Sequence, residues 1–315
     1  MKILPRAALL AVMALSAGAD PGHEIRIEDL NRQIAENPAL PDLYFQRSVN
    51  YREVNRLADA RADLEKCLSL EKGFLPANRE LARMDDQEGH RKEAIERLEK
   101  AIAAAPPEAA FHLPGCYSVL TELLLKSDRN EVALAAASKG ISLTQELTID
   151  LYLLRAEAQR RLGKYDDRVR DLAGATERLK SFVLRIAWLE ALIDAGRSEE
   201  VLPEIQKEID TSRYKASWLI RRARVLIHDG RKTEAAADLE AALVEVESRI
   251  RPELPDLSLV CDRALIWALQ GKRDEAAREL ADAKKRGADQ WMTRVLEAVL
   301  AKPGNDQTKK PESEK

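Results

Sequence analysis

Apolar residues recur at helical spacing along almost the whole chain, and the alternation of apolar and polar residues that marks strands is missing. A turn residue interrupts the helical runs at intervals of 33 to 41 residues, and it is often Gly followed by a basic residue. The break points are Asn55, Gly89, Asp128, Gly163, Gly196, Gly230 and Gly271. A period of about 34 residues is typical of antiparallel helix pairs that stack into a solenoid.

The positions around each break repeat in the same order. Seven residues before a break the side chain is mostly small, and nine residues after it the side chain is mostly a large aliphatic one, as in Ala82 and Leu98 around Gly89. Small side chains let two helix backbones approach closely, and the aliphatic side chain then fills the seam between them. The sequence therefore predicts an all-α protein built from about seven helix pairs.

Two stretches carry a specific resemblance. The run from Leu151 to Tyr165, with Leu162-Gly163-Lys164-Tyr165 at its end, and the run from Gly89 to Leu98 resemble the tetratricopeptide repeat family, in an exported bacterial form. The resemblance implies a right-handed α-solenoid over residues 41–290. Its seven repeats fall at 41–74, 75–108, 114–147, 149–182, 182–215, 216–249 and 257–290. Residues 109–113 and 250–256 lie between repeats, where Pro114-Gly115, Pro252 and Pro255 predict loops.

The two ends of the chain have different compositions. Lys2 and Arg6 precede the apolar run Ala7–Leu15, and small residues follow at 17–19, so we expect a signal peptide over 1–19 that is cleaved near Ala19. The apolar run is shorter than a membrane span requires. This pattern predicts a protein that is exported to a periplasmic or extracellular space. Residues 20–40 and 291–301 are expected to hold capping helices, and residues 302–315 a disordered tail.

Arginine and acidic residues are paired in four repeats. Each of four helix pairs carries an Arg on its first helix and, sixteen residues later and across the turn, an acid on its second helix. In a helix-turn-helix of this length, that spacing brings the two positions face to face. We therefore expect structural ion pairs, some of them bidentate. The pairs are Arg47 with Asp63, Arg155 with Asp171, Arg222 with Asp238, and Arg263 with Glu279.

The resemblance also implies a concave groove, lined by the second, fifth, ninth, twelfth and thirteenth residues of each repeat. In the first four repeats these positions carry mixed charges, and in the last three they are mostly apolar. An apolar stripe of this kind marks either a partner-binding site or a surface that the superhelix or the C-terminal helix covers. The candidate groove residues are Arg79, Arg83, Arg160, Arg161, Val183, Ile186, Ile193, Ile220, Arg224, Ile227, His228 and Leu265.

The composition of the chain argues against several classes of function. With 51 basic and 54 acidic residues, the formal net charge is -3, which argues against a nucleic-acid partner. The four His and three Cys are scattered, so we expect no metal, no cofactor and no catalytic residue. Our first hypothesis is a non-enzymatic, exported scaffold that binds a peptide or helix of a partner protein in the groove. The alternatives are a structural part of an envelope assembly that uses its convex surface or its ends and, less favoured, an α/α-solenoid enzyme.

Overall fold

The computed structural model describes residues 21–143, 149–251 and 253–302, and within them the regular structure is helical, with no strand. The predicted signal peptide and nearly all of the predicted tail lie outside these residues. The described chain divides into two compact units, with the boundary between Leu184 and Arg185. This boundary falls in the first turn of α10 (Phe182–Asp194), so we describe α10 with the C-terminal unit.

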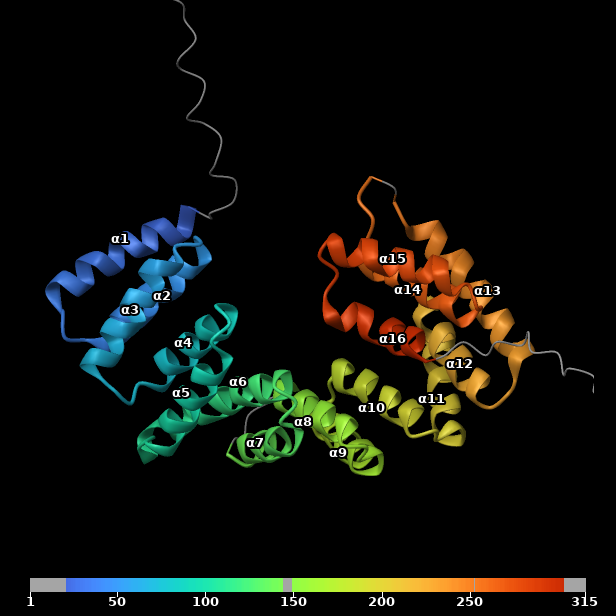
Figure 1. The fold of residues 1–315 in the computed structure, drawn as a ribbon, viewed down its shortest axis with the longest axis horizontal. Helices are drawn as coiled ribbons and strands as arrows, with labels where there is room; N and C mark the ends of the chain where they lie inside the picture. The colour runs from blue at the N-terminus through green and yellow to red at the C-terminus, as the bar shows by residue number, and fades with distance from the viewer. Residues whose placement is uncertain (1–20, 144–148, 252, 303–315) are drawn as a thin grey trace, which may run out of the picture. The chain divides into compact units, whose positions relative to one another are not determined.

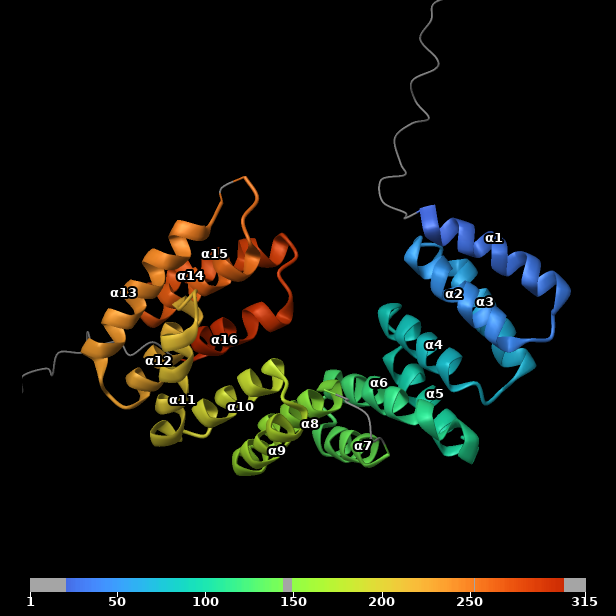
Figure 2. The ribbon, with the colours of Figure 1, turned by 180° about the vertical axis from the view of Figure 1, so that it is seen from behind.

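The N-terminal unit is a series of antiparallel helix pairs (Figures 1 and 2). Helix α1 (Pro21–Glu36) packs on α2 and covers the start of the series. A short 3-10 helix, η1 (Pro107–His112), connects the second pair to the third. The pairs are α2 (Pro41–Glu53) with α3 (Leu57–Leu70), α4 (Leu75–Gln87) with α5 (Arg91–Ala103), α6 (Leu113–Lys126) with α7 (Asn130–Ser142), and α8 (Ile149–Arg161) with α9 (Tyr165–Leu179).

The C-terminal unit continues the same pattern. Its pairs are α10 with α11 (Ser198–Thr211), α12 (Ala216–His228) with α13 (Lys232–Arg249), and α14 (Leu257–Leu269) with α15 (Arg273–Lys285). A last helix, α16 (Gln290–Ala301), packs more on α14 than on α15. Helices α16 and α14 lie side by side in both views (Figures 1 and 2). We call the first helix of each pair helix A and the second helix B.

Each break that the sequence indicates is a turn with left-handed backbone. A positive φ costs an ordinary L-residue free energy, and Gly, Asn and Asp tolerate it best. Five of the seven break positions are therefore glycine, and the other two are Asn55 and Asp128. The φ angles are 58° at Asn55, 90° at Gly89, 54° at Asp128, 68° at Gly163, 68° at Gly196, 76° at Gly230 and 87° at Gly271.

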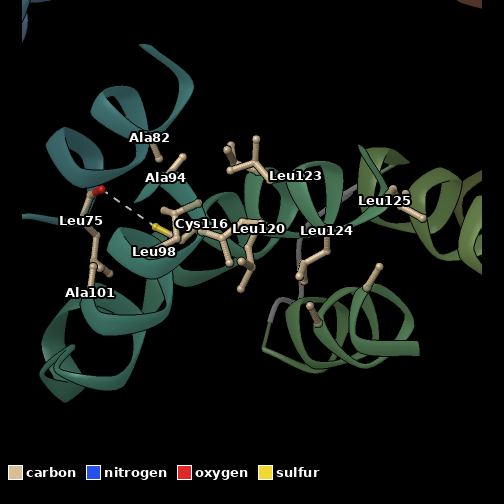
Figure 3. Close-up of a cluster of buried hydrophobic side chains, with 14 of the residues drawn as sticks. Leu75, Ala82, Ala94, Leu98, Ala101, Cys116, Leu120, Leu123, Leu124 and Leu125 are labelled. Atoms are coloured by element: carbon tan, nitrogen blue, oxygen red, sulfur yellow. Dashed lines mark hydrogen bonds between the residues drawn. The ribbon is translucent and has the colours of Figure 1, made fainter. Parts of the chain in front are cut away.

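The core of the N-terminal unit lies between successive helix pairs. Leu98 of α5 and Leu120 and Leu124 of α6 meet small residues of α4 and α7 in one apolar cluster (Figure 3). Cys116 lies in the same cluster, with its sulfur 3.9 Å from the carbonyl oxygen of Leu75. Burial raises the pKa of this thiol to about 11, so Cys116 acts as a small packing residue.

All four expected Arg–carboxylate pairs are present. Arg47 binds both oxygens of Asp63, at 2.7 Å and 2.6 Å, and Arg222 binds both oxygens of Asp238, at 2.8 Å and 2.6 Å. Arg263 contacts both oxygens of Glu279. Arg155 makes a single contact of 3.1 Å with Asp171, whose same oxygen accepts from Gln159 at 2.7 Å. These pairs join helix A to helix B within one repeat.

Two of these arginines also donate a hydrogen bond to the helix that precedes their own pair. Arg47 donates to Asn31 of α1 at 2.7 Å, and Arg222 donates to Gln206 of α11. One guanidinium therefore connects three successive helices. Because each donor group has a fixed direction, this contact sets the orientation of one pair on the preceding helix.

The connection before α6 differs from the expected loop. Residues 107–112 form η1, and α6 begins at Leu113, so Pro114 and Gly115 lie in its first turn. Proline is tolerated there because the first turn of a helix leaves its N–H groups without intrahelical partners. Between the sixth and seventh repeats, the described residues 250, 251 and 253–256 form no helix.

Candidate functional site

The most distinctive charged cluster of the N-terminal unit lies on helices α2 and α4. Glu80 of α4 is buried, and its carboxylate accepts from Arg79 at 3.1 Å, from Arg83 at 2.9 Å and from Arg52 of α2. Three guanidinium groups thus surround one carboxylate. We name Arg52, Arg79, Arg83 and Glu80 the arginine cluster.

The arginine cluster keeps unused hydrogen-bond donors. Arg79 donates to Glu80 through Nε, and neither of its terminal nitrogens donates to any residue that the structure describes. Arg83 uses one terminal nitrogen, and 46% of its side chain is exposed. Gly115 makes room for Arg79, because a Cβ there would lie 2.7 Å from a terminal nitrogen of Arg79. The cluster therefore presents donors and an excess of positive charge at its surface.

An aromatic pair lies next to this cluster. Helix η1 packs against α4 and α6, both of which are helices A. It carries His112, whose pKa is lowered by burial and by the nearby charge of Arg79. The ring of Phe111 lies 3.6 Å from the His112 ring, centroid to centroid, and Phe111 is 75% exposed. An apolar surface and a cationic surface thus adjoin each other.

The predicted groove residues Arg160 and Arg161 are engaged within the protein. Both contact Glu157, at 2.7 Å and 2.8 Å. Arg161 also donates to the carbonyl oxygen of Leu125 at 2.6 Å, at the end of α6. The hydrogen bond to Leu125 joins α8 to α6, whereas the contacts with Glu157 lie within α8 and neutralise part of the positive charge of the two arginines.

In the C-terminal unit the corresponding charges are enclosed. Arg224 of α12 contacts Glu190 of α10 at 2.8 Å, and Arg221 contacts it at the same distance. Burial by itself raises the pKa of Glu190, but the charges of Arg224 and Arg221, and more weakly that of Arg294 on α16, lower it to about 2. Glu190 is therefore ionised and holds α10 and α12 together.

On α12 and α14, the apolar stripe predicted for the last repeats is an interior surface, which corrects the assignment of Ile220 and Leu265 to an open groove. Ile220 is 3% exposed and Leu265 is 7% exposed, and both belong to one apolar cluster with Leu296 of α16. Ile227 is half-buried in the same cluster. Helix α16 packs on α14, so at Leu265 the C-terminal helix covers the predicted stripe.

The remaining predicted groove residues of the C-terminal repeats lie on α10 and at the end of α12. Val183 is exposed, and Ile186 and Ile193 are half-buried along α10. His228 is exposed at the end of α12, where its Nδ1 lies 3.3 Å from a carboxylate oxygen of Asp229. These residues do not form a continuous exposed stripe with Ile220 and Leu265.

Within the described residues, no group of three or more His, Cys, Asp or Glu side chains is arranged to hold a metal ion. The same part of the chain has no helix whose length and apolar character would let it cross a membrane. The thiols are buried, and burial raises the pKa of Cys67 to about 12 and that of Cys261 to about 11. None of the three thiols is activated for chemistry.

Comparisons with known proteins agree with this architecture. The tetratricopeptide repeat family model matches residues 41–74. A solved tetratricopeptide repeat protein from Parabacteroides merdae is similar to 83% of this chain and to 99% of its own length, with 18% identity and a TM-score of 0.58. Yeast Tom70 is similar to 88% of this chain and to 58% of its own, with 16% identity and a TM-score of 0.51. The fold is an α-solenoid of helix pairs, similar to that of tetratricopeptide repeat proteins. The search of curated proteins found no match.

Sequence reasoning missed parts of the arginine cluster of this solenoid. Glu80 is the sixth residue of its repeat, outside the expected ligand-facing positions, although it stands beside Arg79 in the chain. Phe111 was also missed, because it lies in a connection that was expected to be a loop. The one sequence feature that could have indicated Phe111 is its position as an aromatic residue between Pro107 and Pro114.

Proposed function

We propose that this protein is a non-enzymatic, exported scaffold that binds a segment of a partner protein on the helix A surface of its N-terminal unit. The fold supports a binding role, because stacked helix pairs present an extended surface and bury their own cores between repeats. The arginine cluster carries the proposal, since it combines positive charge with guanidinium donors that no described residue uses.

The contrast between the two units favours the N-terminal one. In the C-terminal unit, the helix A positions of α12 and α14 are buried, and the protein's own α16 packs on α14. A partner would first have to displace that helix. The corresponding positions at Arg79 and Arg83 are partly exposed. We therefore place the contact with a partner on α2, α4 and α6.

Export is the cellular part of the proposal, and it depends on the sequence pattern of residues 1–19. Intact-mass measurement of the protein from its native host tests it. We expect a chain that begins near Asp20. A full-length chain that remains in the cytoplasm would contradict export and leave the binding proposal standing.

Photocrosslinking tests the binding surface. A photoreactive amino acid replaces Gln87, an exposed residue at the end of α4, and in a matched control it replaces Lys100, an exposed residue of α5. We expect a discrete protein adduct from position 87 and none from position 100. Adducts from position 100 alone would favour the architectural function, in which the convex surface makes the contacts.

A further inference from the structure

The geometry points to a chemical class of partner, an inference that depends on the proposed function. We propose that the arginine cluster binds internal Asp or Glu side chains of a partner segment, and that Phe111 contacts an apolar side chain next to them. The ligand is thus an acidic and apolar stretch within a polypeptide. A free chain terminus is not needed.

Charge at the cluster is the first reason. Glu80 and the Glu53 carboxylate beside Arg52 together offset two of the three guanidinium charges, so a local excess of positive charge remains. Glu80 also orders the arginines, because all three donate to the same carboxylate. An arginine that is already held in place loses less conformational freedom when it binds, which favours the planar, two-point recognition of a carboxylate.

The neighbouring acids indicate why isolated carboxylates fit better than a continuous polyanion. The carboxylate of Glu53 lies 3.6 Å from the guanidinium of Arg52, and the carboxylate of Glu122 lies 2.7 Å from the ammonium of Lys126. About half of each acidic side chain is exposed. A nucleic-acid strand with one phosphate per nucleotide would pass close to these carboxylates and be repelled. A peptide can place one or two acidic side chains at the cluster and avoid them.

Phe111 supplies the apolar part of the site. Its ring is largely exposed on η1, and the adjoining His112 lies close enough to Arg79 for the guanidinium charge to lower the imidazole pKa. An extended peptide with a carboxylate on Arg79 can therefore bring a neighbouring side chain onto this ring. Burial of an aromatic side chain adds affinity that depends weakly on salt, whereas the ionic part is screened.

A random 12-residue peptide library tests the proposal. The peptides are displayed as internal fusions, so that no free carboxyl terminus is present, and they are selected on the full chain. We expect selected peptides to be rich in Asp or Glu beside an apolar residue. Replacing those acids by their amides should weaken binding at least tenfold, and raising NaCl from 50 to 300 mM should weaken it severalfold. Failure to select peptides, or equal binding of acids and amides, would overturn the proposal.

Variants of the protein locate the site. Arg79→Gln with Arg83→Gln should abolish the preference for acids, whereas the matched pair Arg32→Gln with Arg170→Gln, at exposed positions elsewhere, should preserve it. Gly115→Ala keeps every charge but forces the Arg79 guanidinium to move, so we expect a loss of at least threefold. An acid preference that survives both Arg79→Gln with Arg83→Gln and Gly115→Ala would contradict the assignment.

Two further measurements separate the possible outcomes. Phe111→Ala should weaken selected peptides severalfold and leave the acid preference intact; an unchanged affinity would remove Phe111 from the site. A labelled 12-nucleotide single-stranded RNA should not bind saturably, and RNA binding that needs Arg79 and Arg83 would show that the ligand class is wrong. If position 87 crosslinks a protein while the acid preference is absent, the scaffold function stands and only this inference fails.

Discussion

Replacing Asp262 by Asn is expected to stabilise the C-terminal unit at neutral pH. Asp262 lies on α14, and no described side chain donates a hydrogen bond to its carboxylate. Burial raises the pKa of Asp262 to about 6 from an ordinary value of 3.8, although the charges of Arg221 and Arg249 oppose the rise. The nearby Asp256 raises it slightly. The ionised form is thus unfavourable in the folded protein.

The magnitude follows from the difference between the two pKa values. A rise of about two units corresponds to about 3 kcal/mol of free energy at a pH above both values. The residue keeps some exposed surface, so we expect the Asn variant to gain about 1–3 kcal/mol at pH 8. Because the folded state binds the proton more tightly, the contribution of Asp262 to stability is lost as the pH rises from about 4 through 6, and it changes little above that. The gain should therefore shrink to about half at pH 5.

Tryptophan fluorescence is a suitable assay, because all four Trp lie in the C-terminal unit. They are Trp188, Trp218, Trp267 and Trp291. Urea unfolding of both proteins at pH 5, 6, 7 and 8 gives the free energy of unfolding of that unit. The range stays above the region where protonation of Glu190, whose pKa is lowered, would also destabilise the fold. An Asn variant that is less stable at pH 8, or a difference that does not change with pH, would refute the reasoning.

Three further changes test the packing. Asp238→Ala should cost about 2–4 kcal/mol because it leaves the half-buried Arg222 without its carboxylate, while replacing both residues by apolar ones of similar volume should be near neutral; urea unfolding by Trp fluorescence measures both. Gly140→Ala should destabilise the N-terminal unit by about 1–3 kcal/mol, because the added Cβ would lie 2.8 Å from the Cβ of Tyr117. Hydrogen exchange of the amides of α6 and α7 measures this loss of stability. Unchanged protection of these amides would count against this packing. Ile220→Asp should unfold the C-terminal unit, as a loss of Trp signal and helicity, so a folded variant would contradict its burial.

The repeat pattern could be predicted because its physical causes are local. A left-handed turn requires Gly, Asn or Asp, and a close helix pair requires small residues, so both leave a periodic signal in the sequence. The pairing of Arg222 with Asp238 was predictable for the same reason: the spacing of sixteen residues across a turn is fixed within one repeat.

The binding surface was less predictable because it depends on contacts between distant segments. The position of Leu265 in its repeat does not show whether it is covered, since that depends on α16, a separate helix that follows the last repeat. The arginine cluster likewise joins Arg52 of one repeat to Glu80 of the next. The division of the chain near Leu184 also had no signal in the repeat pattern.

The most direct test of the account concerns α16, because the placement of the binding surface on the N-terminal unit depends on it. Methyl NMR of the full chain can detect contacts between the methyl groups of Leu296 and those of α14. We predict cross-peaks between the methyl groups of Leu296 and those of α14, including the methyl groups of Leu265. We also predict slow hydrogen exchange of the amides of α14. A Leu296 that shows no contact with α14, with fast exchange in α14, would mean that the apolar surface is open and that the partner site belongs there.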